Sequence, residues 1–152
     1  MSLGIADIAD TLRRNPLFRR IGDDRLRIVA LTGEVCRLHD GETLFRRGEE
    51  GDAAYVVLSG AVLVRIPIAG RDQTVARLGV GELFGEIAVL CDRPRTTAIV
   101  AEGETALLRL GGRELRALLS EFPELSLELI RSLADRLEAT SLKLAEARSA
   151  AG

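Results

Sequence analysis

Apolar residues recur with two different periods along this chain, and the period changes twice. Over residues 4–14, and again over residues 23–33, they step by three and four, which predicts two amphipathic helices. Over residues 34–110, short runs alternate between apolar and polar positions and are separated by glycine turns, a pattern typical of all-β proteins. After residue 111 the helical period returns. The sequence therefore predicts a β-rich centre with helices on both sides.

Eight segments of the central part have the length and alternation of β-strands. A turn at Ser59-Gly60 is expected to separate two of them. Eight strands at this spacing indicate an antiparallel β jelly roll, so the predicted fold class is mainly β with flanking helices (α+β). The candidate strands are residues 34–38, 43–45, 54–58, 61–66, 74–78, a short one near 83, 97–101 and 105–110.

The C-terminal helical part contains a short helix and then a longer one that starts at Pro123. The longer helix carries an apolar stripe broken by one threonine, which is wide enough to bury. The stripe could pack against the β-roll or against a second chain, and a homodimer through this helix remains open. Its members are Ile130, Leu133, Leu137, Thr140, Leu144 and Ala147.

The length of 152 residues fits one domain with one core. We expect N-terminal helices over residues 1–33, a β-roll over 34–110 and C-terminal helices over 111–152. The formal charge of −2 argues against a direct nucleic-acid surface, which usually needs a basic excess. No apolar run approaches the roughly 18 residues of a membrane span, and the start lacks the pattern of a signal peptide. A cytoplasmic location without a membrane span is therefore expected.

The stretch from Phe84 to Ala98 contains the chemistry of a phosphate site. Gly85 has no Cβ and allows a ligand to approach the backbone closely. The apolar run after it is long enough for one helical turn, whose unpaired N–H groups would face an anion. Arg95 follows nine residues after Glu86, and its planar, permanently charged fork suits two phosphate oxygens. Thr96 and Thr97 add hydroxyls beside it.

Glu86 needs a different partner, because its carboxylate would repel a phosphate. An ionised carboxylate only accepts hydrogen bonds, so a sugar hydroxyl is a suitable donor. Together, Glu86 and Arg95 describe a nucleotide with a free ribose 2′-OH. Taken singly, each has a simpler explanation: Arg95 could be a surface ion-pair partner, and Glu86 could be an acidic residue in a first helical turn.

The two halves of this stretch, Phe-Gly-Glu-Ile-Ala and Pro-Arg-Thr-Thr-Ala, resemble at this spacing the phosphate-binding cassette of the cyclic nucleotide-binding domain family, which includes catabolite-activator-like regulators. The resemblance places the cassette at residues 83–97 and implies that Glu86 binds the ribose 2′-OH. It implies that Arg95 and the cassette amides bind the cyclic phosphate. The remaining cassette contacts of the family match Gly85, Ile87, Ala88 and Thr96.

The base is less well defined by this resemblance. A hydroxyl at Thr96 either contacts the phosphate or favours cGMP, and because it also occurs in cAMP binders, we expect cAMP rather than cGMP. Val64 and Val75 align with family positions that line the purine, although both could equally be core residues. Phe84, in the cassette itself, is expected near the same base pocket.

The expected function is that of a cyclic nucleotide sensor, not an enzyme, whose C-terminal helices move and whose last helix closes as a lid. The effector domain or partner protein stays unknown. One alternative is a structural or dimerisation β-roll with a non-functional pocket, which the pairing of Glu86 with Arg95 disfavours. A distant alternative is a cupin-like enzyme. His39 is the only histidine, expected in an exposed loop, and it cannot form the histidine cluster that such a metal site requires. No metal site is expected.

Overall fold

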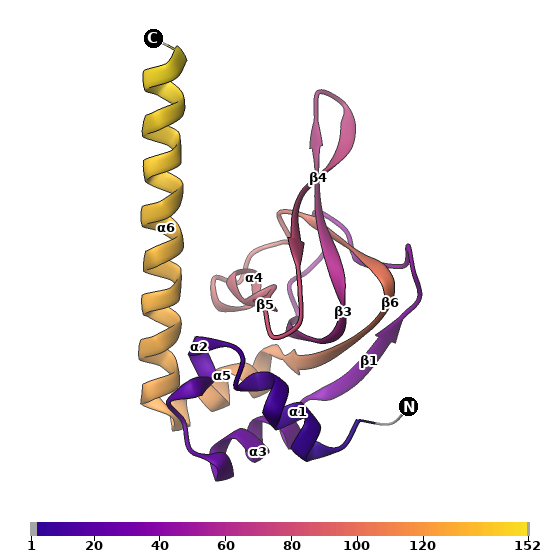
Figure 1. Ribbon diagram of the computed structural model, residues 1–152, viewed down its shortest axis with the longest axis vertical. Coiled ribbons are helices and arrows are strands. Elements are labelled where there is room, and N and C mark those ends of the chain that lie inside the picture. The colour runs from indigo at the N-terminus through magenta and orange to yellow at the C-terminus, as the bar shows by residue number, and fades with distance from the viewer. Residues whose placement is uncertain (1–2, 152) are drawn as a thin grey trace.

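The computed structural model describes residues 3–151 and consists of an antiparallel β-sheet with helices at one end and a long helix at its side (Figure 1). The main strand order is β1-β6-β3-β4, with β2 paired to β6 and β5 paired to β3. The elements are α1 (Ile5–Leu12), α2 (Pro16–Arg19), α3 (Asp23–Thr32), β1 (Glu34–Leu38), β2 (Thr43–Phe45), β3 (Ala53–Ile68), β4 (Arg71–Leu78), β5 (Leu83–Phe84), α4 (Glu86–Leu90), β6 (Ala98–Gly111), α5 (Gly112–Glu121) and α6 (Pro123–Ala151).

The fold class is as predicted, but the residues described form six strands and not eight. The expected turn at Ser59-Gly60 is a bend inside β3, where the register with β6 shifts on both sides of Ser59. Gly60 has a φ of 77°, and a Cβ there would lie 2.4 Å from the Glu104 carbonyl oxygen. The strand therefore turns sharply without ending, because glycine permits the bulge. In the same way, β6 continues through Gly103 and joins two of the expected strands.

Residues of β3 are buried on both of its faces. Ala54, Val56 and Leu58 pack into a core shared with the helices. The residues between them, including Tyr55 and Val57, pack into a second core inside the curved sheet, which also contains Phe45 and Phe84. Alternate residues of a strand point to opposite faces, so this one apolar strand joins the two cores.

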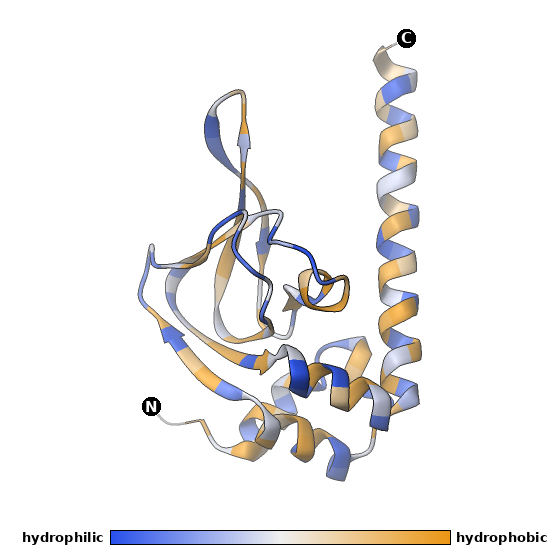
Figure 2. Cartoon of the chain, turned by 180° about the vertical axis from the view of Figure 1, so that it is seen from behind, coloured by the Kyte–Doolittle hydropathy of each residue, from blue (hydrophilic) through white to orange (hydrophobic). Residues whose placement is uncertain are grey.

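Helix α6 leaves the domain after its first turns. Its buried residues are Leu125 and Leu129, and Leu133 packs partly against the helical core. Further along, Leu137 is 68% exposed and Leu144 is 56% exposed. Figures 1 and 2 show this half of the helix, with its apolar bands, extending away from the rest of the chain. Of the predicted stripe, Leu133 thus packs partly on its own domain, whereas Ile130, at 63% exposed, and the members after Leu133 do not. No helix within residues 3–151 is both long and apolar enough to cross a membrane.

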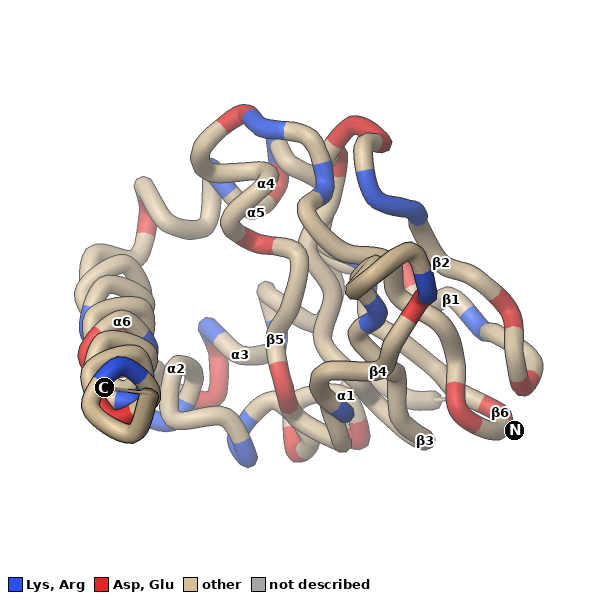
Figure 3. The backbone as a smooth tube through the Cα atoms, turned by 90° about the horizontal axis from the view of Figure 1, so that it is seen from above, with Lys and Arg blue, Asp and Glu red and all other residues tan. Residues whose placement is uncertain are grey.

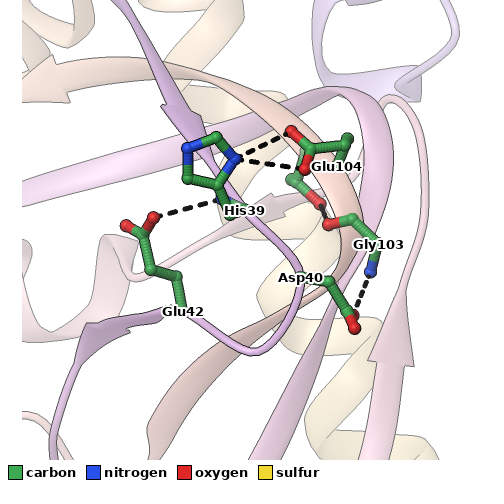
Figure 4. Close-up of polar contacts among 6 residues, drawn as sticks. His39, Asp40, Glu42, Gly103 and Glu104 are labelled. Carbon is green, nitrogen blue, oxygen red and sulfur yellow. Dashed lines mark hydrogen bonds and ion pairs between the residues drawn. The ribbon is translucent and has the colours of Figure 1, made fainter.

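The only histidine takes part in a polar cluster that joins the turn after β1 to the bend of β6 (Figure 4). The Nδ1 atom of His39 lies 3.1 Å from Oε1 of Glu104, and its backbone N–H donates to Glu42 at 3.2 Å. The backbone N–H of Gly103 donates to Asp40 at 2.7 Å. The hydrogen bond and the charge of Glu104 raise the pKa of His39.

We predict that an NMR titration of the single imidazole gives a pKa above the ordinary value of 6.5 and that Glu104→Gln moves it back towards that value. Because the folded-state pKa is raised, the ion pair favours the folded state fully below the unfolded-state pKa. That contribution is lost as the pH rises through the folded-state pKa. The matched variant Glu42→Gln should change the pKa less. A larger change from Glu42→Gln than from Glu104→Gln would contradict the contact.

Candidate functional site

The cassette stretch lies between β5 and β6, on the side of the sheet that faces α6 (Figures 1 and 3). Gly85 ends β5 with a φ of 81°, which aims the chain into the short helix α4. A Cβ at this position would lie 2.7 Å from Nη1 of Arg95 and 3.3 Å from the Ala53 carbonyl oxygen. Glycine is thus required here twice, for its backbone conformation and for the approach of the arginine.

Arg95 lies in the interior with only 3% of its surface exposed. Its Nη1 donates to the Gly85 carbonyl oxygen at 2.9 Å, and its Nη2 donates to the Ala53 carbonyl oxygen at 2.6 Å. The guanidinium carbon lies 4.0 Å from the centre of the Phe45 ring, in a cation–π contact. These contacts fix the plane of the guanidinium before any ligand binds.

The charge of Arg95 is only partly compensated within the described residues. It forms an ion pair with Oδ1 of the exposed Asp52, 3.7 Å from Nη2, and the buried Nε has no hydrogen-bond partner. Burial lowers the pKa of Arg95, which reflects the cost of removing its charge from water. A buried cation with a free N–H is a suitable site for an anion.

Glu86 begins α4 and is 2% exposed. Its Oε1 accepts a hydrogen bond from Nη1 of Arg136 at 3.2 Å, and Arg136 lies on α6. The carboxylate is therefore held beside the cavity and is already in contact with the long helix. Sequence analysis missed Arg136. Its only signal was a basic side chain next to the apolar stripe of that helix, between Leu133 and Leu137.

A cavity of about 690 Å³ lies between the sheet, the cassette and α6, within the usual size range for small-molecule sites. Ser132 and Arg136 of α6, together with Leu78 and Ile99 of the sheet, line it in addition to the expected residues. Nine of the ten site residues expected from the sequence lie in its wall: Val64, Phe84, Gly85, Glu86, Ile87, Ala88, Arg95, Thr96 and Thr97.

Val75 is the tenth, and it is 49% exposed and outside the wall of the cavity. The pairs Val62 with Leu78 and Val64 with Ala76 place the even-numbered residues of this part of β4 on the inner face. The next pair is Arg65 with Thr74, so the register shifts here and Val75 is left without a counterpart on β3. Its side chain is exposed at this irregularity and does not reach the cavity. Leu78 of the same strand lines the cavity instead.

Among residues 3–151, no group of three or more His, Cys, Asp or Glu side chains is placed to hold a metal ion.

Comparison with known proteins identifies the same family as the resemblance of the cassette. The model of the cyclic nucleotide-binding domain matches residues 35–122. The cyclic AMP receptor protein of Thermus thermophilus is 36% identical over 135 residues, which are 88% of this chain and 62% of that protein. The CRP-like cAMP-activated global transcriptional regulator of Mycobacterium tuberculosis is 34% identical over 78% of this chain and 54% of its own length. The chain thus spans less than two thirds of the length of these curated relatives.

Solved structures share the fold over most of the chain. The Thermus thermophilus catabolite activator protein superposes with a TM-score of 0.81 at 32% identity, over 86% of this chain and 62% of that one. The regulatory domain of Toxoplasma gondii PKA, crystallised with cAMP, has a TM-score of 0.69 at 27% identity, over 75% of this chain and 44% of that one. With the family model covering more than half of its residues, this chain belongs to the cyclic nucleotide-binding domain family.

Proposed function

We propose that this domain is a regulatory module that binds a cyclic purine nucleotide, with cAMP preferred over cGMP, and performs no chemistry on it. The observation that carries the proposal is the buried, incompletely compensated Arg95 in the wall of the same cavity as the buried Glu86. A cyclic nucleotide offers the two groups that these side chains need, an anion and a hydroxyl donor.

In this arrangement the cyclic phosphate binds between Arg95 and the backbone of Gly85 to Ala88. Thr96 and Thr97, both in the wall of the cavity, supply hydroxyls at the same end. The ribose 2′-OH donates to Glu86. The purine occupies the apolar part of the cavity, against Val64, Leu78 and Ile99, with Phe84 below the sugar. The preference for cAMP is supported by two related proteins: a cyclic AMP receptor protein and a PKA regulatory domain that was crystallised with cAMP.

The contact between Arg136 and Glu86 links the ligand to α6. A ribose hydroxyl that binds Glu86 must share this carboxylate with Arg136 or displace it, so the nucleotide and the helix position affect each other. We infer that α6 transmits binding to a partner or an effector domain. Its exposed apolar stripe pairs with the same stripe of a second copy, because helices with such a stripe are stable when it is buried.

Calorimetric titration with cAMP, cGMP and 5′-AMP tests the function directly. Saturable binding of a cyclic form, with cAMP tighter than cGMP and 5′-AMP weaker than both, supports a sensor. No binding of any of the three by the folded domain would favour a structural roll instead.

Arg95→Ala is expected to weaken cAMP binding by about 2 to 4 kcal/mol, because the phosphate loses the charged partner that the fold holds in place. Arg95→Lys should recover only part of this loss, since a point charge lacks the planar fork. Calorimetry measures both, with circular dichroism as a check of folding because Arg95 also binds two backbone carbonyls. Unchanged affinity in a folded Arg95→Ala variant would refute the phosphate role.

Glu86→Gln is expected to reduce the affinity for cAMP more than the affinity for 2′-deoxy-cAMP, because only the first ligand has the hydroxyl that Glu86 accepts. The comparison within one variant cancels any general damage to the site. Equal losses for the two ligands would show that Glu86 does not bind the sugar.

Leu137→Ser combined with Leu144→Ser should convert a dimer to a monomer in sedimentation velocity, because both leucines belong to the exposed stripe. Leu142 is also exposed, at 60%, but lies off the stripe, so Leu142→Ser is the matched control and should remain dimeric. A wild-type chain that stays monomeric at high concentration would contradict the pairing.

A further inference from the structure

One carboxylate outside the cavity wall lies between two arginines. Oδ1 of Asp52 is 3.7 Å from Nη2 of Arg95, and its Oδ2 accepts a hydrogen bond from Nη2 of Arg109 at 3.4 Å. The first distance is too long for a hydrogen bond, while the second is that of a long hydrogen bond. Asp52 is thus bonded to Arg109 and only electrostatically paired with Arg95.

Arg109 belongs to β6 and does not line the cavity. Its partner in the register of β3 and β6 is the buried Tyr55, whose pKa is raised by burial, and the nearby positive charge of Arg109 opposes that rise. The Tyr55 ring stacks on Phe84 with 5.5 Å between centres and lies 6.2 Å from the Phe45 ring, which in turn supports Arg95.

These contacts close a ring that begins and ends at Arg95. The ring passes through Phe45, Tyr55, Arg109 and Asp52. Three of its members are charged: two guanidinium groups and one carboxylate, with a net charge of one positive unit. If Arg109 were absent, the remaining charged pair would be neutral, and Asp52 would be free to move onto Arg95. An anion in the cavity would then meet a cation that another carboxylate already neutralises.

The backbone also restrains Asp52. Its carbonyl oxygen accepts a hydrogen bond from the N–H of Gly112 at 2.8 Å, where α5 begins. The Cα position of Asp52 is therefore fixed on the side of β6, and its side chain is the part that can choose between the two arginines. Two thirds of that side chain is exposed, so each of the two pairings is moderate in strength.

We propose that Arg109 is a positioning residue for the nucleotide site: it holds Asp52 away from Arg95 and so preserves the positive charge that binds the phosphate. The inference rests on the proposed function, since it concerns the affinity of the same cavity for a cyclic nucleotide. Arg109 does not line the cavity, and its role is to control Asp52. Without that control, the negative charge of Asp52 beside Arg95 would oppose the binding of an anion.

The test is a double-mutant cycle on cAMP affinity, measured by calorimetry with the whole 152-residue chain. Arg109→Gln is expected to weaken binding about three- to tenfold, the size of coupling usual for charged neighbours in one network. In the Asp52→Asn background the same change should have little effect, because no carboxylate remains to neutralise Arg95. Arg109→Lys should restore most of the affinity, since a lysine can still pair with Asp52.

Arg71→Gln is the matched control, because it removes the same charge from the exposed tip of the β3–β4 hairpin. It should leave the affinity unchanged, which separates the local effect from the loss of overall positive charge. Circular dichroism establishes that each variant is folded.

The outcomes separate the two proposals. If the wild-type chain does not bind a cyclic nucleotide, the proposed function fails. If it binds and Arg109→Gln behaves like Arg71→Gln, the positioning role is overturned while the function stands. Equal losses from Arg109→Gln with and without Asp52→Asn would also overturn it, because Arg109 would then act through the fold and not through Asp52. A loss confined to the background that retains Asp52 supports it.

Discussion

The buried guanidinium of Arg95 is the constraint on which the rest of this structure depends. Taking a permanent positive charge out of water costs several kcal/mol unless other groups replace the lost hydration. The fold supplies two carbonyl oxygens, one aromatic face and a distant carboxylate, and it leaves the Nε atom without a partner. These contacts hold the side chain in one orientation, but they leave one of its N–H donors without an acceptor. An anion is the kind of partner that the free Nε lacks, and this supports the proposal that the site binds a phosphate.

Holding that guanidinium in place requires strands that are far apart in sequence. The Ala53 carbonyl oxygen comes from the start of β3, and the Gly85 carbonyl oxygen comes from the end of β5, which pairs with β3. Because β3 is buried on both faces, it joins the helical core to the inner core and gives both acceptors a rigid support. The glycine bulge at residue 60 shifts the register of β3 with β6 and lets the two strands stay paired around the curve, so the sheet can enclose the cavity.

Sequence reasoning identified residues that line the cavity wherever those residues are close together in the chain. Gly85, Glu86 and Arg95 lie within eleven consecutive positions, so their spacing alone indicated a shared role. Features that depend on pairing between distant segments were harder. A glycine bulge and a glycine turn have the same local signature, so six strands were read as eight. Val75 lies where the register of β4 with β3 shifts, an irregularity that no local sequence pattern indicates. The approach of Arg136 to Glu86 depends on how α6 docks, which no local pattern encodes.

One end of helix α6 lines the cavity and its other end extends away from the sheet, so this helix can carry a change at the cavity to a partner. Its contact with the cavity depends on Ser132 and Arg136, about one helical turn apart, whereas its far half is exposed. An exposed ion pair would contribute little, but Glu86 is buried, and a buried carboxylate that loses its partner is destabilised unless another donor replaces it. A ribose hydroxyl is such a donor. In the proposed function, a ribose hydroxyl on Glu86 compensates for the loss of Arg136 from this carboxylate. A coupling of about 1 to 3 kcal/mol, which is typical of allosteric proteins, is then enough to move the helix without unfolding any part of the sheet.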